Sequence, residues 1–335
     1  MLQIKESIGP GIVKASMPDI WHTLKDRITE VCATFYEEPT PPGFYPHFNE
    51  VALRMTLLRQ VPELHALQEQ IRHLLKSDFC ALVLDKLHLE AYAQPMRNRL
   101  LYALCTAIGF ATPSSQHQAT LLWDVRARAV PQGRDATYSE HSAEADLHTD
   151  SQSYPTPEEY FVLYTFHAAR CGGGQSLFLG VDALTDWLQS RPEGREALKV
   201  LGTHTFPFFI SAGEGTQTGG TVTTAPILGT QPAIRFRRDV IEKGFQAKPE
   251  LDTPAARLAI ATLLEAFQQC PALTTYSLPD DGIAICNNHR MLHGRTAFQD
   301  TDRHLVRVRM SHQPVAAHVM RMLQEHAAFA KALLA

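Results

Sequence analysis

The sequence predicts a mainly β fold, a barrel or a double sheet, with helices that flank it. At 335 residues, of which 44% are hydrophobic and 20% charged, the chain can bury a large core. Eight short runs of β-branched or aromatic residues, each bounded by turn residues, are spread over residues 119–310. Segments with helical spacing of apolar residues precede and interrupt these runs. A double sheet of this kind can enclose a ligand cavity.

The first predicted elements are mostly helical. Residues 62–76 carry Leu64, Leu67 and Ile71 at helical spacing, after a proline suited to a first turn. A short apolar strand is predicted over 79–87. A second helix is predicted over 95–110, ending near Gly109.

The rest of the chain predicts strands with two helical interruptions. The predicted strands are 119–130, 158–169, 175–180, 203–210, 220–228, 233–237, 282–288 and 304–310. Helices are predicted over 181–191, 253–270 and the Ala-rich tail 315–334. Because no internal repeat or linker is visible, residues 1–335 are expected to form one domain. It divides into a partly helical N-terminal elaboration (1–110), a core with inserts (111–314) and a C-terminal helix (315–335).

Charge and cysteine content exclude several classes of protein. The formal net charge is -4 and no long run of Lys or Arg occurs, so a nucleic-acid partner is not expected. The N-terminus lacks the apolar core of a signal peptide, and no later run approaches a membrane span. The six cysteines are scattered without a C-x-x-C pair, which predicts reduced thiols in the cytoplasm.

One short motif, LHTD at residues 147–150, indicates a metal site. In a strand, His148 and Asp150 would project to the same side. A later histidine, His293, would complete two histidines and one carboxylate, the set that suits non-heme ferrous iron with coordination positions left open. Because the chain holds 16 histidines, a surface or hydrogen-bonded pair is the alternative for the motif alone. His289 is a rival for the role of His293.

Three stretches together resemble a known family. LHTD, MLHGRTAF (291–298) and DRHLVR (302–307) are similar in order and spacing to the 2-oxoglutarate-dependent non-heme iron oxygenases of the taurine dioxygenase and clavaminate synthase superfamily. The resemblance implies a double-stranded β-helix, or jelly roll, that binds Fe(II) through His148, Asp150 and His293 and uses 2-oxoglutarate and O2. Relatives close to clavaminate synthase often carry glutamate where this chain has Asp150, which leaves the subfamily open.

The resemblance also implies cosubstrate contacts. Arg303 matches the family position whose guanidinium binds the far carboxylate of 2-oxoglutarate, and such a fork suits a carboxylate. The alternative is an exposed strand arginine paired with Asp300 or Asp302. Ser176, in CGGGQS, stands where relatives have a threonine whose hydroxyl reaches the same carboxylate.

Two residues are candidates for substrate binding. Arg307, four residues beyond Arg303 on a predicted strand, would share its face, and family members use this position to hold an anionic group. Glu144 could receive an ammonium group, and a solvated loop carboxylate is its alternative. The expected activity is hydroxylation of an unactivated C–H bond in a small anionic substrate, such as an amino acid or an amino-acid-derived natural-product intermediate. Desaturation or cyclisation, or a non-catalytic metal-binding jelly roll, are the alternatives. The sequence leaves the oligomeric state open.

Overall fold

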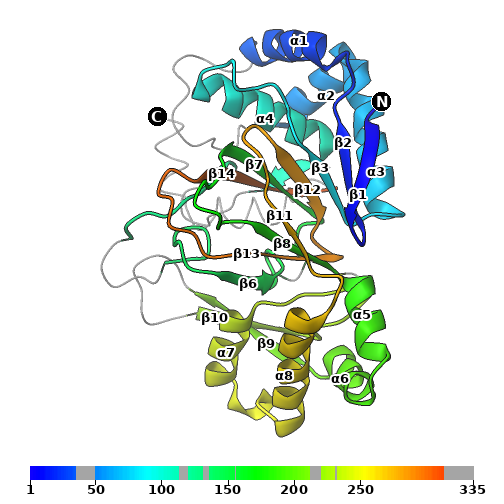
Figure 1. Ribbon diagram of the computed structural model, residues 1–335, viewed down its shortest axis with the longest axis vertical. Coiled ribbons are helices and arrows are strands. Elements are labelled where there is room, and N and C mark those ends of the chain that lie inside the picture. The colour runs from blue at the N-terminus through cyan, green and yellow to red at the C-terminus, as the bar shows by residue number, and fades with distance from the viewer. Residues whose placement is uncertain are drawn as a thin grey trace.

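Two facing β-sheets form the centre of the computed structural model, with helices at both ends (Figure 1). The structure describes residues 1–34, 50–112, 120–130, 136–154, 156–211, 220–230 and 232–312. No helix in this described part is long and apolar enough to cross a membrane.

The larger sheet has eight strands in the order β1-β2-β3-β12-β7-β14-β4, with β5 paired to β14. Most of its pairings are antiparallel, and β2 with β3 is parallel. Its strands are β1 (Gln3–Gly9), β2 (Ile12–Ser16), β3 (Ala81–Leu84), β4 (Phe110–Thr112), β5 (Trp123–Val125), β7 (Tyr160–His167), β12 (Ile283–Asn287) and β14 (His304–Ser311).

The smaller sheet has four strands in the order β11-β8-β13-β6. They are β6 (Ala145–His148), β8 (Ser176–Gly180), β11 (Thr274–Tyr276) and β13 (Met291–Arg295). A separate hairpin joins β9 (Phe206–Ser211) to β10 (Gly220–Ala225).

Helices pack at the two ends of the molecule (Figure 1). One group lies beside the larger sheet: α1 (Trp21–Ala33), α2 (Glu50–Gln60), α3 (Pro62–Lys76) and α4 (Gln94–Ile108). The other group lies beyond the smaller sheet: α5 (Val181–Gln189), α6 (Pro192–Thr203), α7 (Arg238–Ala247) and α8 (Pro254–Gln269), with a short 3-10 turn at Pro249–Leu251.

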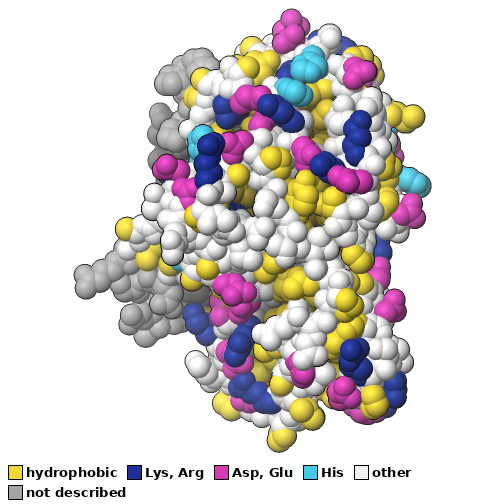
Figure 2. Space-filling model, in the orientation of Figure 1, with side chains coloured by type: hydrophobic (Ala, Val, Ile, Leu, Met, Phe, Trp, Pro, Cys, Tyr) yellow, Lys and Arg dark blue, Asp and Glu magenta, His cyan; other side chains and the backbone are white. Residues whose placement is uncertain are grey.

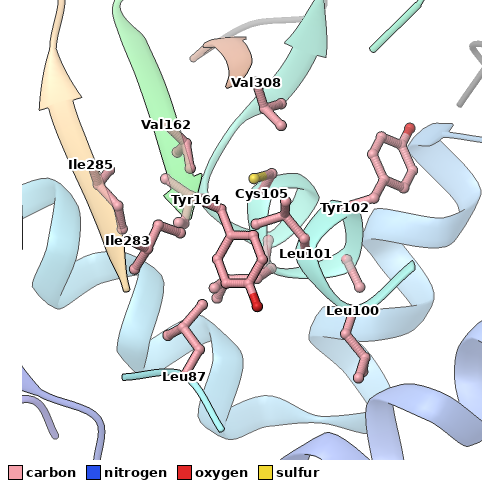
Figure 3. Close-up of a cluster of buried hydrophobic side chains, with 14 of the residues drawn as sticks. Leu87, Leu100, Leu101, Tyr102, Cys105, Val162, Tyr164, Ile283, Ile285 and Val308 are labelled. Carbon is pink, nitrogen blue, oxygen red and sulfur yellow. The ribbon is translucent and has the colours of Figure 1, made fainter. Parts of the chain in front are cut away.

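The alternation of side chains along each strand sorts the core into layers. On β14, Val308 packs with Val162 and α4 on the helical side of the larger sheet (Figure 3), and Val306 belongs to the same cluster. The neighbouring Leu305 faces the other way, into the apolar layer between the sheets, with Phe161, Phe178 and Met291 as further members of that layer. A third cluster joins the outer side of the smaller sheet to α5–α8. Arg307 and Arg309 share the inward parity of Leu305, so the strand pattern directs two arginines between the sheets.

The predicted fold class is confirmed, and most predicted elements are present. Helices form close to the predicted spans 62–76, 95–110, 181–191 and 253–270. The prediction of a strand over 233–237 is wrong, because this segment makes only an isolated bridge between Leu228 and Ile234. The N-terminal elaboration supplies three strands of the larger sheet as well as helices. The tail predicted to be helical lies outside the described residues, and the single-domain assignment stays a prediction.

Charged side chains are mixed on the surface. On the face in Figure 2, Lys and Arg lie among Asp and Glu at both ends of the molecule, and no extended basic area is displayed there.

Candidate metal centre

Strand pairing brings two histidines together between the sheets. His148, the last residue of β6, lies directly opposite His293 on β13, and residues opposite each other across a sheet point to the same side. Their ring centroids are 4.2 Å apart. The ring of Phe161, from the larger sheet, lies 4.1 Å from that of His293. Both histidines are therefore held in the apolar layer between the sheets.

Asp150 reaches the same point from a turn, not from a strand. His148 and Asp150 were predicted to lie on one strand, but β6 ends at His148. Asn288 fixes the turn: its Oδ1 accepts from the Asp150 N–H at 2.8 Å, and its Nδ2 donates to the carbonyls of Asp150 at 3.0 Å and Glu158 at 2.9 Å. The next residue, Ser151, has φ of 54°, a left-handed conformation that non-glycine residues rarely adopt.

The three side chains form a buried group with the donor set of a metal site. One ligand atom from each of His148, Asp150 and His293 lies within 4.8 Å of the others. Asp150 Oδ2 and His293 Nδ1 are buried without a hydrogen-bond partner, which is costly unless a ligand satisfies them. His148 Nδ1 contacts the Asp146 carbonyl at 2.7 Å, an outer contact that orients a ligating ring. These residues fit a divalent metal ion.

Burial and charge set the protonation of the group. Burial, followed by the charge of His293, lowers the pKa of His148 well below its usual value. Burial also lowers the pKa of His293 to about 4. Burial opposes ionisation of Asp150, but the Arg307 guanidinium and the neighbouring imidazoles hold its pKa below the ordinary value. Two neutral imidazoles and one carboxylate are the forms in which these residues bind metal.

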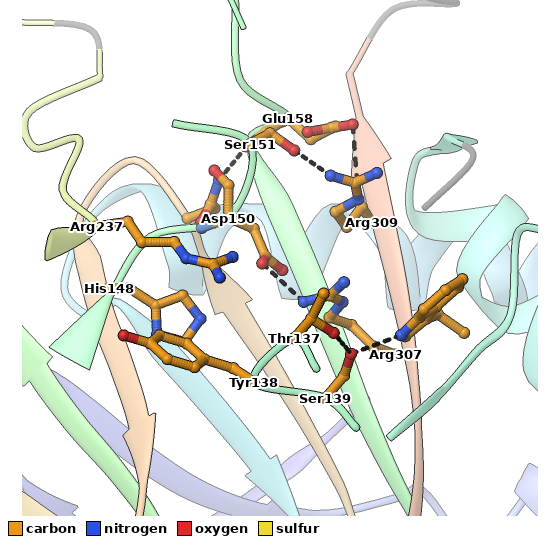
Figure 4. Close-up of polar contacts among 12 residues, drawn as sticks. Thr137, Tyr138, Ser139, His148, Asp150, Ser151, Glu158, Arg237, Arg307 and Arg309 are labelled. Carbon is orange, nitrogen blue, oxygen red and sulfur yellow. Dashed lines mark hydrogen bonds and ion pairs between the residues drawn. The ribbon is translucent and has the colours of Figure 1, made fainter. Parts of the chain in front are cut away.

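Two arginines approach from β14 on the larger sheet (Figure 4). Arg307 donates to Asp150 Oδ1 at 2.8 Å, whereas its Nε is buried without a partner. Arg309 bonds the Ser151 hydroxyl and lies 3.9 Å from Glu158. Glu158 also accepts from the Thr112 hydroxyl at 2.6 Å. The carboxylates at this edge of the site are thus already matched by cations.

Arg303 is buried without an acidic partner in the described structure. It is 3% exposed, its side chain donates to described residues only through Nε to the Gly174 carbonyl at 3.3 Å, and its Nη1 has no partner. Burial lowers its pKa to about 9. Gly174 has φ of +71°, and a Cβ there would lie 2.8 Å from Arg303 Nε. The alternative of an exposed arginine paired with Asp300 or Asp302 is wrong, and the buried fork fits a bound carboxylate.

Two buried hydroxyls lie on strands that border this region. Ser176, 4% exposed, begins β8 opposite Arg295 and shares the inward parity of Phe178. Thr165, on β7 opposite Leu305, is fully buried and its Oγ1 has no partner. Thr165 was not singled out in the sequence, where it reads as one more β-branched strand residue.

Two further sequence candidates lie elsewhere. Glu144 is exposed, just before β6 begins, and is not part of the buried group. His289 is buried, and its Nε2 contacts the Pro157 carbonyl at 2.9 Å, so it is not one of the grouped ligands.

The buried Arg295 holds the segment that precedes β6 through hydrogen bonds to its backbone. Arg295 donates to the carbonyls of Tyr138 at 2.9 Å, His141 at 2.8 Å and Ala143. Its guanidinium shares the Phe298 ring with Arg303, at 4.8 and 4.9 Å from the ring centroid. Tyr138 then packs edge-on against His148, with centroids 5.0 Å apart. Arg295 stands in the H-G-R motif, which was the available signal for its importance.

Comparisons with known proteins agree with this geometry. The family model described as "Taurine catabolism dioxygenase TauD, TfdA family" matches residues 52–309. The chain is similar to the solved non-heme iron oxygenase OrfP in complex with Fe, succinate and (3R,4R)-dihydroxy-L-Arg, with TM-score 0.63, 16% identity, and coverage of 90% of this chain and 94% of that one. It is also similar to an asparagine oxygenase in complex with Fe(II), 2S,3S-3-hydroxyasparagine and succinate, with TM-score 0.63, 16% identity, and 89% and 93% coverage. OrfP with Fe and alpha-ketoglutaric acid gives TM-score 0.60 and 17% identity, with 90% and 94% coverage. At these low identities, the TM-scores show a shared fold and nothing more. No curated protein matches the chain.

Proposed function

Because the chain belongs to the TauD, TfdA family of dioxygenases, we propose that it hydroxylates a small amino acid, or a compound derived from one, with Fe(II), 2-oxoglutarate and O2. The observation that carries this proposal is the buried group of His148, Asp150 and His293, with ligand atoms within 4.8 Å and unsatisfied atoms on two of its members. Two histidines and one carboxylate leave coordination positions for cosubstrate and oxygen.

His148, Asp150 and His293 would hold the iron, and the residues around them set their protonation. Bound iron would supply oxygen activation, the chemistry that opens an unactivated C–H bond. The protein keeps both imidazoles neutral through burial and keeps Asp150 ionised beside Arg307. The apolar wall of Phe161 at His293 excludes water from one side of the site.

Arg303 would bind the far carboxylate of 2-oxoglutarate. Its guanidinium is buried, stacked on Phe298 and short of hydrogen-bond partners. A carboxylate would satisfy this fork with charge-assisted bonds. Ser176, as the resemblance implies, would add a hydroxyl donor, and Thr165 offers a second one with an unpartnered oxygen.

Arg307 would orient the substrate through its carboxylate. It is the one sequence candidate for substrate binding that touches the metal group, through Asp150. The contact uses one terminal nitrogen, so the fork keeps donors for an incoming anion. The solved neighbours bind hydroxylated arginine and hydroxyasparagine, which supports an amino-acid substrate. Glu144, being exposed, would take part only through contact with substrate at the rim.

The test is a panel of the twenty common amino acids and their N-acylated and amidated forms, assayed for succinate release and for a product heavier by one oxygen. We expect at least one free amino acid to raise succinate formation well above the rate without substrate. His293→Ala should abolish this response. A product lighter by two hydrogens would indicate desaturation or cyclisation. Iron binding without succinate from any compound would favour a non-catalytic metal-binding protein.

The cytoplasm is the compartment we propose for this activity. All six cysteines are free, and five of them are buried, as expected of thiols kept in a reducing environment.

A further inference from the structure

Arg237 ends the segment 233–237, which was predicted to be a strand and which lies beside the metal group. The Thr149 N–H donates to the Phe236 carbonyl at 2.8 Å, and the Phe236 N–H donates to the Thr149 hydroxyl at 3.1 Å. Thr149 lies between His148 and Asp150 in the chain, so the residue after Phe236 emerges next to both ligands. Figure 4 shows the Arg237 guanidinium pointing into the space near His148 and Asp150.

The guanidinium is fixed in this orientation. Asp239 accepts from Arg237 Nε at 2.8 Å and from Nη2 at 3.0 Å, and the Tyr138 ring lies 4.5 Å from the guanidinium carbon. Arg237 Nη1 makes no hydrogen bond with any residue that the structure describes. The Arg237 side chain is 23% exposed and that of Asp239 is 40% exposed, so the carboxylate lies on the outer side. The Arg237 guanidinium is therefore held in place with its Nη1 edge available to a ligand in the site.

Tyr138 lies between Arg237 and the metal group. The ring that lies 4.5 Å from the Arg237 guanidinium carbon also packs edge-on against His148, with ring centroids 5.0 Å apart. The guanidiniums of Arg237 and Arg307 both point toward the space around Asp150 (Figure 4).

The described carboxylates around the site are already matched by arginines. Asp150 pairs with Arg307, and Glu158 lies against Arg309. Asp239 pairs with Arg237 at the rim. A substrate with a cationic side chain would meet two guanidiniums, and each of these three carboxylates is already paired with an arginine. An anionic side chain would meet the unused edge of Arg237.

From this arrangement we propose that Arg237 binds an anionic side-chain group, so that the substrate is an acidic amino acid, one whose side chain ends in a carboxylate or sulfonate. Arg307 binds the α-carboxylate and Arg237 the distal group, which makes Arg237 a specificity-determining residue. The inference rests on the proposed function and narrows its substrate class. It sets this chain apart from OrfP, whose solved complexes hold hydroxylated arginine.

The test compares acids with their isosteric amides: aspartate with asparagine, and glutamate with glutamine. Binding to the protein loaded with Fe(II) and 2-oxoglutarate is measured by calorimetry without oxygen, and turnover by succinate release with oxygen. We expect the acid of at least one pair to bind about tenfold tighter than its amide, because only the acid forms an ion pair with the guanidinium. Arg237→Gln should reduce that ratio to about threefold or less, and Arg237→Lys should retain part of it. Arg238→Gln, a change at the exposed neighbour, should leave the ratio unchanged.

The outcomes separate this inference from the proposed function. If amino acids are turned over but an amide or a cationic amino acid binds as tightly as the acid, the inference alone is overturned. An acid preference that survives Arg237→Gln would also overturn it. No binding and no succinate with any amino acid or any N-acylated or amidated form would overturn the proposed function and the inference together. If Arg237→Gln fails to fold, the acid-to-amide affinity ratios of the wild type and of Arg237→Lys test the inference.

Discussion

Asn288 is the residue that fixes the turn from which Asp150 reaches the metal group. Three of its hydrogen bonds hold the backbone of Asp150 and Glu158. Since an intramolecular hydrogen bond contributes about 1 kcal/mol net, Asn288→Ala should lower the free energy of unfolding by about 2–3 kcal/mol. It should also weaken Fe(II) affinity by about tenfold or more, as loss of outer contacts does in metal sites.

The neighbouring Asn287 provides a matched control. It is also buried and bonded to backbone, donating to the Leu75 carbonyl at 3.1 Å and accepting from the His289 N–H at 3.0 Å, but it does not touch the Asp150 turn. Asn287→Ala should cost stability while leaving Fe(II) affinity within about threefold. Fe(II) affinity is measured by metal titration of both variants. An equal loss of Fe(II) affinity in the two would show that Asn288 acts only through stability.

Arg303 is expected to determine the affinity for 2-oxoglutarate. Arg303→Met removes the only cation proposed for the far carboxylate of 2-oxoglutarate, and hydrogen bonds to charged groups contribute about 1.5–3 kcal/mol. The KM for 2-oxoglutarate should therefore rise by about 10–100-fold, with a smaller effect on substrate. Arg170→Met, at an exposed arginine whose side chain is 81% exposed, should leave this KM unchanged. An unaltered 2-oxoglutarate affinity in Arg303→Met would shift the role to Arg307.

The sequence predicted that His148, Asp150 and His293 come together, because their motifs are local and their spacing is typical of a family. It did not predict Asn288, Arg237 or Thr165. Their roles arise from contacts between segments far apart in the chain, such as the pairing of Phe236 with Thr149. No pattern in one sequence reports such a contact.

At the scale of elements, amphipathic helices were predicted best. Helix α3 occupies the predicted residues 62–76 and buries Leu64, Leu67 and Ile71. Strand β1 was not predicted, because most of its residues are exposed and polar and so lack the apolar pattern of a strand. Helix α1 begins without a side-chain cap or an acidic first turn, so it gave no start signal. Strands β6 and β13 were not among the strands predicted from residue patterns, because they are only four and five residues long and so offer too short a pattern.

The segment before β6 depends on Arg295, and this dependence can be tested. Arg295→Met leaves three carbonyls without their donor and should loosen residues 136–144. We expect faster proteolytic cleavage within this segment and a raised KM for substrate, because Tyr138 would no longer be held against His148. Arg290→Met, just before the other end of β13, removes a contact to Asp182 and should not change cleavage of 136–144. Unaltered proteolysis in Arg295→Met would refute this role.

At the scale of the whole molecule, the site exists only where the two sheets face each other. The smaller sheet supplies His148 and His293, and the larger one supplies Arg307. A ligand bound to groups from both sheets should stabilise the folded state, by about 2.7 kcal/mol at 100 times its Kd. Fe(II) with 2-oxoglutarate should therefore raise the Tm by several degrees in a scan without oxygen. Chelation of the metal should reverse the shift, and His148→Ala should show almost none. An equal shift in His148→Ala would mean that the ligands bind elsewhere.

We propose that one buried site binds Fe(II) through His148, Asp150 and His293, and 2-oxoglutarate through Arg303. The most direct test is an anaerobic titration of the Fe(II)-loaded protein with 2-oxoglutarate, followed by visible absorbance. We predict a weak charge-transfer band that saturates at one 2-oxoglutarate per protein, is absent in His293→Ala, and requires a higher cosubstrate concentration in Arg303→Met. A protein that binds iron but gives no band at saturating 2-oxoglutarate, or an unchanged band in His293→Ala, would contradict the account.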